Sequence, residues 1–253
     1  MDTNRPPLAT YADMAQLFDH SLVRPELTED QIRDGCDLAA EYGVATVSVR
    51  PSDIDIAIRQ LRGTNVRVGS LAGFPHGSQN TATKLYEVRD LIRRGAKEID
   101  MVINIGKLVS RQWHYCETEL VQMANACHAE GVILKCIVET AYLDHEQKIV
   151  ACKLMKHAQV DYIKTSTGIA PTGYTREDVA LFYSKCHPFV KVKAAHGVRT
   201  MERAIEAYEA GADRIGVTAT KTMLDAWKAE LKRRAESGEP APAAATATEG
   251  SGY

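Results

Sequence analysis

The sequence of 253 residues lacks several features that would place it in a specialised class. No apolar run approaches the roughly 20 residues that span a bilayer, so we expect no membrane partner. The N-terminal segment, MDTNRPPLAT, has no apolar core of signal-peptide length, which predicts a cytoplasmic protein. Neither sign of charge is in excess, because 31 Lys and Arg residues stand against 33 Asp and Glu residues. A net charge of -2 gives no electrostatic reason to expect nucleic acid as a partner.

Cysteine patterns that bind metals are also missing. None of the cysteines forms a Cys-x-x-Cys pair, and no spacing resembles a zinc site, so we predict no metal site. Several lie in periodic apolar runs, which predicts buried, reduced thiols of the kind found in cytosolic proteins. The six cysteines are Cys36, Cys116, Cys127, Cys136, Cys152 and Cys186.

The two ends of the chain differ in composition from the middle. Residues 1–10 include Pro6-Pro7 and predict a flexible lead. Residues 236–253, ESGEPAPAAATATEGSGY, have no large aliphatic side chain and cannot bury enough apolar surface to offset chain entropy. We therefore predict a disordered tail there and a single domain over residues 11–235.

Between these ends a short β-rich run followed by a longer helical segment repeats along the chain. The helical segments carry end signals, such as the capping box Thr28-Glu29-Asp30-Gln31 and the terminating Gly211. From the second run onward the runs start 21 to 35 residues apart, which fits one strand, one helix and two loops. Eight such units predict a (β/α)8 TIM barrel, with a doubly wound open sheet as the alternative. The runs start at Phe18, Ala45, Val66, Glu98, Ile133, Asp161, Val190 and Arg214.

Three charged residues fall inside predicted strands: Asp100 in the fourth, Lys164 in the sixth and Lys193 in the seventh. Isolated buried charges are costly, so charges held by one barrel are expected to converge at its mouth and pair. Desolvation and a neighbouring cation both lower the pKa of an amine. Lys193 is then the cation that favours a neutral, nucleophilic Lys164, which forms a Schiff base while Asp100 and Lys193 donate and accept protons. Spacing alone leaves a solvated lysine at the barrel rim as the alternative.

The residues that follow the last two β-rich runs include groups that can bind an anion. In barrels these loops and the start of the last helix commonly bind phosphate through backbone N–H groups and hydroxyls. Thr218, Thr220 and the cation Lys221 fit this pattern. The alternative is that Thr218 caps a helix.

Five motifs follow one another along the chain: FDHSL at 18–22, GFPHG at 73–77, EIDMV at 98–102, YIKTSTG at 162–168, and a last one from Lys193 through GVRT at 197–200. Together they resemble the 2-deoxyribose-5-phosphate aldolases, class I aldolases with a barrel fold. The resemblance runs from about Leu17 to Leu224. It implies that Lys164 is the Schiff-base lysine, Lys193 the second lysine and Asp100 the acid of the proton relay.

The resemblance also implies a substrate and the residues that bind it. The family reaction is the reversible cleavage of 2-deoxy-D-ribose 5-phosphate to acetaldehyde and D-glyceraldehyde 3-phosphate, without metal or organic cofactor. Family members are often dimers or tetramers, so a homo-oligomer is expected. The expected substrate-binding residues are Asp19, near the sugar hydroxyl, Thr167, and, near the phosphate, Gly168, Gly197, Gly216 and Thr218.

The chain departs from the family pattern mainly around the phosphate. The residues from Ile169 to Gly173 replace a glycine-rich run, His196 stands where a Gly-Gly pair is usual, and Ala219 replaces a second hydroxyl residue. We expect Lys221 to compensate by its charge. The departures leave two alternatives open: a related acetaldehyde-dependent aldolase with a different or non-phosphorylated acceptor, and a non-catalytic barrel that binds a sugar phosphate.

Overall fold

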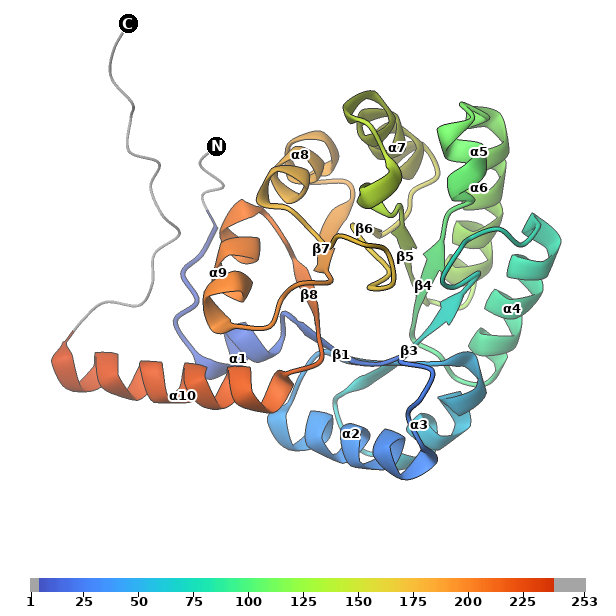
Figure 1. Ribbon diagram of the computed structural model, residues 1–253. Coiled ribbons are helices and arrows are strands. Elements are labelled where there is room, and N and C mark those ends of the chain that lie inside the picture. The colour runs from blue at the N-terminus through green and yellow to red at the C-terminus, as the bar shows by residue number, and fades with distance from the viewer. Residues whose placement is uncertain (1–4, 239–253) are drawn as a thin grey trace, which may run out of the picture.

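Eight parallel strands close into a barrel with the helices outside it (Figure 1). The computed structural model describes residues 5–238. Each strand pairs with the next along the chain, and the eighth pairs with the first, which confirms the (β/α)8 barrel and rules out the open sheet. The strands are β1 (Phe18–Leu22), β2 (Thr46–Val49), β3 (Arg67–Ala72), β4 (Glu98–Val102), β5 (Ile133–Ile137), β6 (Tyr162–Lys164), β7 (Lys191–Ala195) and β8 (Arg214–Val217).

The helices begin and end where the local sequence predicts. At Thr28 both halves of the capping box form, since Thr28 Oγ1 accepts from the Gln31 N–H and Gln31 Oε1 accepts from the Thr28 N–H. Gly211 ends its helix in the left-handed conformation, with φ 118°. The helices are α1 (Tyr11–Ala15), α2 (Glu29–Tyr42), α3 (Ile54–Gln60), α4 (Thr81–Arg93), α5 (Ile105–Val109), α6 (Trp113–His128), α7 (His145–His157), α8 (Arg176–Cys186), α9 (Met201–Ala210) and α10 (Thr220–Ser237), with short 3-10 turns η1 (Pro51–Asp53) and η2 (Thr140–Tyr142).

Residues 5–10 are tied to the barrel by side-chain contacts. Arg5 Nη1 donates to the backbone oxygen of Ala212 (2.8 Å), and Arg5 Nη2 pairs with Asp213 (2.9 Å). These contacts place Arg5 against the barrel, the flexible lead expected over residues 1–10 stays a prediction, and residues 1–4 lie outside the described range. At the other end α10 runs to Ser237, two residues past the expected domain end, and the tail predicted to be disordered lies outside the described residues from 239 on.

The barrel interior is filled by four layers of side chains, each contributed by alternate strands, as the register of the strand pairs requires. From the N-terminal end of the strands upward, the layers are Thr46, Glu98, Tyr162 and Arg214; Asp19, Gly69, Lys135 and Lys193; Ser48, Asp100, Lys164 and Gly216; and Ser21, Leu71, Ile137 and Ala195. Barrel interiors are usually dominated by branched apolar residues. Here the lower three layers hold seven charged side chains, so ion pairing determines how this interior packs.

A fully buried ion pair fixes the end of β4, the strand that carries Asp100. Lys84 Nζ, from α4, pairs with Glu119 of α6 at 3.0 Å and donates to the Val102 backbone oxygen at 2.7 Å. Glu119 in turn accepts the Asn104 N–H at 3.2 Å. Because both helices contact the backbone on either side of residue 103, the position of this strand end is held from two directions.

Candidate active site

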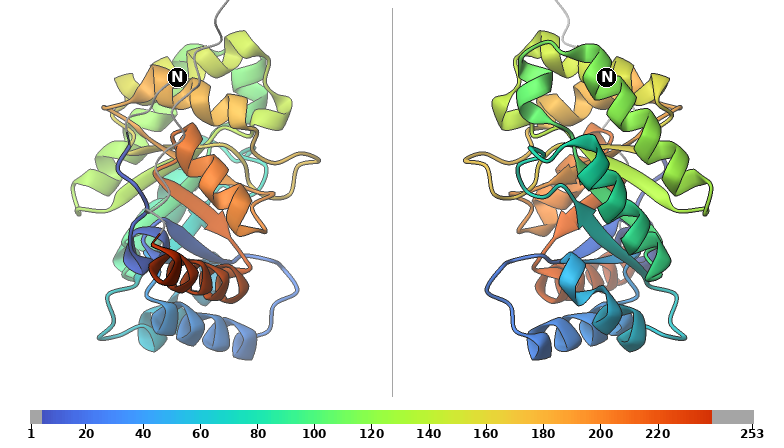
Figure 2. Two further views of the ribbon diagram at one scale, coloured as in Figure 1. Left: turned by 90° about the vertical axis from the view of Figure 1, so that its left-hand side faces the viewer. Right: turned by 90° about the vertical axis from the view of Figure 1, so that its right-hand side faces the viewer.

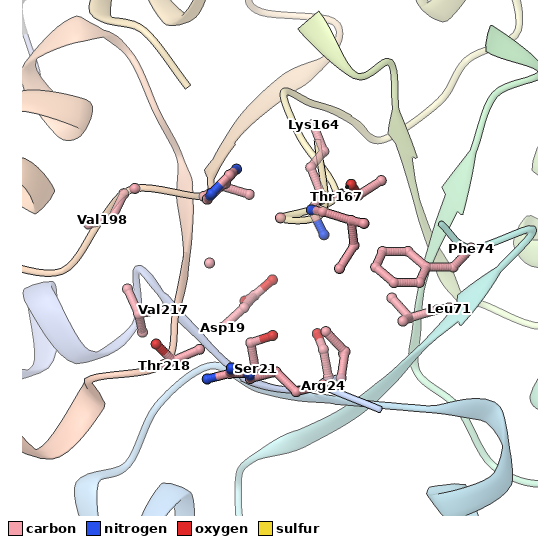
Figure 3. A pocket seen from close by; sticks show the side chains of 18 of the residues that line it. Asp19, Ser21, Arg24, Leu71, Phe74, Lys164, Thr167, Val198, Val217 and Thr218 are labelled. Atoms are coloured by element: carbon pink, nitrogen blue, oxygen red, sulfur yellow. Dashed lines mark hydrogen bonds between the residues drawn. The ribbon is translucent and has the colours of Figure 1, made fainter. Parts of the chain in front are cut away.

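A cavity of about 400 Å³ opens at the C-terminal ends of the strands (Figure 3). Its floor includes Asp19, Lys164 and Lys193, and its walls come from the loops after β1, β6, β7 and β8. Figure 2 shows two of these loops, after β1 in blue and after β6 in gold, projecting at the same end of the barrel. The location agrees with the rule that barrel active sites form at this end.

The three residues expected to carry the chemistry are in direct contact. One carboxylate oxygen, Asp100 Oδ2, lies 2.7 Å from Lys164 Nζ and 2.7 Å from Lys193 Nζ. Lys193 Nζ also lies 2.5 Å from Asp19 Oδ2. All four side chains are buried, with Lys164 the most exposed at 7%. Asp100 therefore bridges the two amines, and a proton can pass between them through a single oxygen.

Three further charged residues below the floor were missed by sequence reasoning: Glu98, Lys135 and Arg214. Lys135 Nζ contacts Glu98 and also lies 2.9 Å from Asp19 and 3.2 Å from Asp100. Arg214 Nε donates to Asp19 Oδ1 at 2.7 Å. Strand alternation carries the signal that finds them, since Glu98 precedes Asp100 by two residues and Lys135 pairs with Asp100 in the register.

These contacts occupy both carboxylate oxygens of Asp19. The resemblance placed Asp19 near a sugar hydroxyl, and the residue does line the cavity. Its Oδ2 pairs with Lys135 and Lys193, and its Oδ1 accepts from Arg214. Asp19 is thus held in place by three cationic side chains, Lys135, Lys193 and Arg214.

Inside the barrel the ion-paired cluster holds one more base than acid, since Lys135, Lys164, Lys193 and Arg214 face Asp19, Glu98 and Asp100. The half-exposed Arg67 at the start of β3 also pairs with Glu98. Burial alone would raise the pKa of Asp100, but Lys135, Lys164 and Lys193 hold this pKa well below its usual range. Burial lowers the pKa of the Lys193 amine to about 8, even though Asp100 and Asp19 act to raise it. The structure thus places a lowered pKa on Lys193 itself, and the cluster can lose one proton near neutral pH.

This lowered pKa predicts how stability depends on pH. Between about pH 8 and 10.5 the unfolded chain binds a proton at Lys193 that the folded protein does not, so the free energy of unfolding rises with pH. Relative to Lys193→Met, the wild type should gain roughly 3 kcal/mol across this window, at 1.36 kcal/mol per pKa unit. Urea denaturation at several pH values measures the difference. Lys191→Met, at the exposed start of the same strand, is the matched control, and a flat difference would contradict the assignment.

A buried carboxylate shapes the turn after β6. Glu139 Oε2 accepts the Thr167 N–H at 3.0 Å and is also bonded by Thr167 Oγ1. Thr167 and the following Gly168, with φ 97°, both line the cavity. Glu139 itself has a left-handed backbone, with φ 54°, and is 1% exposed. Sequence reasoning missed it, because its partner lies 28 residues away on another loop.

The other residues expected at the phosphate divide into two groups. Gly197, Gly216 and Thr218 line the cavity. The expectation for Lys221 is wrong, because its Nζ bonds to Tyr42 Oη (2.8 Å) and Asp225 (3.1 Å) outside the cavity lining. Its position on the outer side of α10 removes the charge that was expected to compensate for the altered loops.

Possible metal ligands, the cysteines and apolar helices are the remaining features to describe among residues 5–238. In this range no group of three or more His, Cys, Asp and Glu side chains is placed to hold a metal ion. All six cysteines are buried and free of disulfides. No helix in the same range is both long and apolar enough to cross a membrane.

Comparison with known proteins identifies the family of this chain. The model of the DeoC/LacD family aldolases matches residues 13–226. A deoxyribose-phosphate aldolase of Clostridium kluyveri is 42% identical over 213 residues, covering 84% of this chain and 97% of that protein. One from Thermococcus kodakarensis is 41% identical over 215 residues, covering 84% and 96%. The solved tetrameric deoxyribose phosphate aldolase from Aeropyrum pernix has a TM-score of 0.82 at 27% identity, covering 88% and 94%. The chain therefore belongs to the DeoC/LacD family of aldolases.

Proposed function

We propose that this aldolase cleaves 2-deoxy-D-ribose 5-phosphate reversibly to acetaldehyde and D-glyceraldehyde 3-phosphate through a Schiff base on Lys164. The observation that carries the proposal is the single Asp100 oxygen held 2.7 Å from both Lys164 and Lys193. Iminium chemistry requires a neutral amine and a group that moves protons, and the shared Asp100 oxygen lets a proton pass from one lysine amine to the other. Lys164 is also the lysine of the pair that lies higher in the barrel and has the greater exposure to the cavity.

The steps follow from this arrangement. The Lys164 amine attacks the C1 aldehyde, and the resulting carbinolamine loses water to give an iminium. The C3 hydroxyl gives its proton to Asp100, which passes it to Lys193, as the C2–C3 bond breaks. The electron pair of that bond moves into the iminium to form an enamine, and glyceraldehyde 3-phosphate leaves. Protonation of the enamine at C2 and hydrolysis then release acetaldehyde and the free amine.

The substrate is the part of the proposal that needs a direct test. Gly168, Gly197, Gly216 and Thr218 line the cavity and are proposed to hold the phosphate by backbone N–H groups and a hydroxyl. Charge-assisted hydrogen bonds contribute about 1.5–3 kcal/mol each. A retro-aldol assay should therefore show a specificity constant at least about 100-fold higher for deoxyribose 5-phosphate than for deoxyribose.

Equal rates for the two sugars would instead favour an aldolase with a non-phosphorylated acceptor, for which His196 and Ala219 are the motivating residues. Cleavage of neither sugar would contradict the proposal itself.

The compartment and the oligomeric state of the enzyme are also part of the proposal. Buried free thiols fit a reducing compartment, so we infer the cytoplasm. The Aeropyrum pernix structure is described as tetrameric, which supports a homo-oligomer here. Light scattering of the purified protein measures the oligomeric state directly.

A further inference from the structure

The loops expected to bind the phosphate depart from the family pattern, so a side chain elsewhere in the cavity is needed to supply positive charge to the phosphate. Lys221 lies outside the cavity lining, and Lys164 and Lys193 are engaged with Asp100 at the floor. Among the cavity-lining residues the remaining cations are Arg199, inside one of the family motifs, and Arg24, which lies outside all of them.

Arg24 lies in the loop between β1 and α2, at the rim of the cavity. In the view of Figure 3, Lys164 lies at one side of the cavity, and Arg24 lies at the other together with Ser21 and Thr218. Its Nε lies 2.8 Å from Glu26 Oε1, and both side chains are largely exposed, at 71% and 58%. Exposed ion pairs of this kind contribute little. A phosphate dianion can therefore replace the Glu26 carboxylate at little cost.

The backbone beneath Arg24 is held by one guanidinium. Arg50, at the end of β2, donates from Nη1 to the backbone oxygens of Arg24 (3.3 Å) and Pro25 (2.8 Å), and from Nη2 to that of Leu27 (2.9 Å). Its Nε donates to Asp53 Oδ2 at 2.5 Å, which fixes the guanidinium plane. These three hydrogen bonds from one guanidinium to one surface loop keep the start of this loop at the cavity.

We propose that Arg24 binds the phosphate of the substrate, and that Arg50 is the positioning residue that holds Arg24 at the cavity. The proposal rests on the proposed function. It assigns a specificity-determining charge to the β1–α2 loop, on the side of the cavity away from the Schiff-base lysine. Because Arg24 and Lys164 lie on opposite sides of the cavity, Arg24 can bind the phosphate without contacting the reacting carbons C1 to C3.

The test compares deoxyribose 5-phosphate with deoxyribose in the wild type and in Arg24→Ala. The variant should lose roughly 10- to 100-fold in kcat/KM for the phosphorylated sugar, chiefly through KM, the scale of one or two charge-assisted hydrogen bonds. Deoxyribose cleavage and borohydride trapping of acetaldehyde should stay unchanged. Arg33→Ala, which removes a partly exposed arginine that pairs with Glu29 on α2, is the matched control and should change the cleavage of neither sugar.

Two further variants test the roles of Glu26 and Arg50. Glu26→Gln removes the competing carboxylate and should lower KM for the phosphorylated sugar. Arg50→Ala should raise this KM with kcat retained, and it should add nothing to Arg24→Ala, because both act through one contact.

Equal losses on both sugars, or no loss, in Arg24→Ala would overturn the inference while leaving the aldolase proposal intact. A wild type that cleaves neither sugar would instead overturn the proposed function, and one that ignores the phosphate would overturn both substrate assignments.

Discussion

Lys164→Met will remove retro-aldol activity by on the order of 10⁴-fold or more, the scale expected when a covalent nucleophile is lost. Methionine keeps the length and most of the volume of the side chain but cannot form a Schiff base. The cluster has one base in excess, and Asp100 keeps Lys135 and Lys193 as partners in the variant. The fold should therefore survive. Steady-state assays measure the loss, and thermal unfolding confirms that the variant is folded.

Covalent trapping shows directly which lysine reacts. Borohydride reduction in the presence of acetaldehyde should modify the peptide that contains Lys164 in the wild type, and no peptide in Lys164→Met. Lys191→Met is the control for general lysine loss and should be trapped as efficiently as the wild type. Modification of Lys193, or of both lysines equally, would mean that the nucleophile has been misassigned.

Asp100→Asn should lower kcat by roughly 10²- to 10⁴-fold, the range for loss of a general acid or base. It should also destabilise the fold by about 3–5 kcal/mol, because removing one partner of a buried ion pair leaves an uncompensated charge. Three lysine amines lie within 3.2 Å of this carboxylate, so the amide leaves their charges poorly balanced. Asp100→Asn should therefore lower both kcat and the free energy of unfolding.

Kinetics and urea denaturation are measured on the same protein preparation. Asp55→Asn, which alters a half-exposed carboxylate paired with Arg94, should change neither quantity appreciably. A variant with full stability and low kcat would show that the charges of the lysines are balanced elsewhere. Normal kcat would remove Asp100 from the proton relay.

The sequence was sufficient to predict the architecture and the central contact of the site. Each β-rich run contains a strand of the barrel, because short β-branched runs and helix caps are local signals. The convergence of Asp100, Lys164 and Lys193 followed from the cost of isolated buried charge. The distances from Asp100 to Lys164 and to Lys193, both 2.7 Å, are consistent with that argument.

What could not be predicted depends on contacts between distant segments. Lys221 was expected to face the phosphate because it begins the last helix, but its direction is set by Tyr42 and Asp225 on the outside of the barrel. Glu139 and Arg50 both act on loops that no local pattern joins to them. Glu98, Lys135 and Arg214, beneath the cavity floor, were missed because Asp100 was the only acid of β4 that sequence reasoning considered. Strand alternation places Glu98 on the same face of β4 as Asp100.

The layered interior has a consequence for how this enzyme can be altered. Lys164 and Asp100 come from even-numbered strands, whereas Ser21, Leu71 and Ala195, which form the next layer toward the acceptor aldehyde, come from odd-numbered strands. Substitutions that reshape the acceptor wall therefore fall on strands that carry neither the nucleophile nor its bridging carboxylate. A library confined to Ser21, Leu71 and Ala195 would explore new acceptors while Lys164 and Asp100 keep their geometry, provided that Asp19 on β1 and Lys193 on β7 are left unchanged.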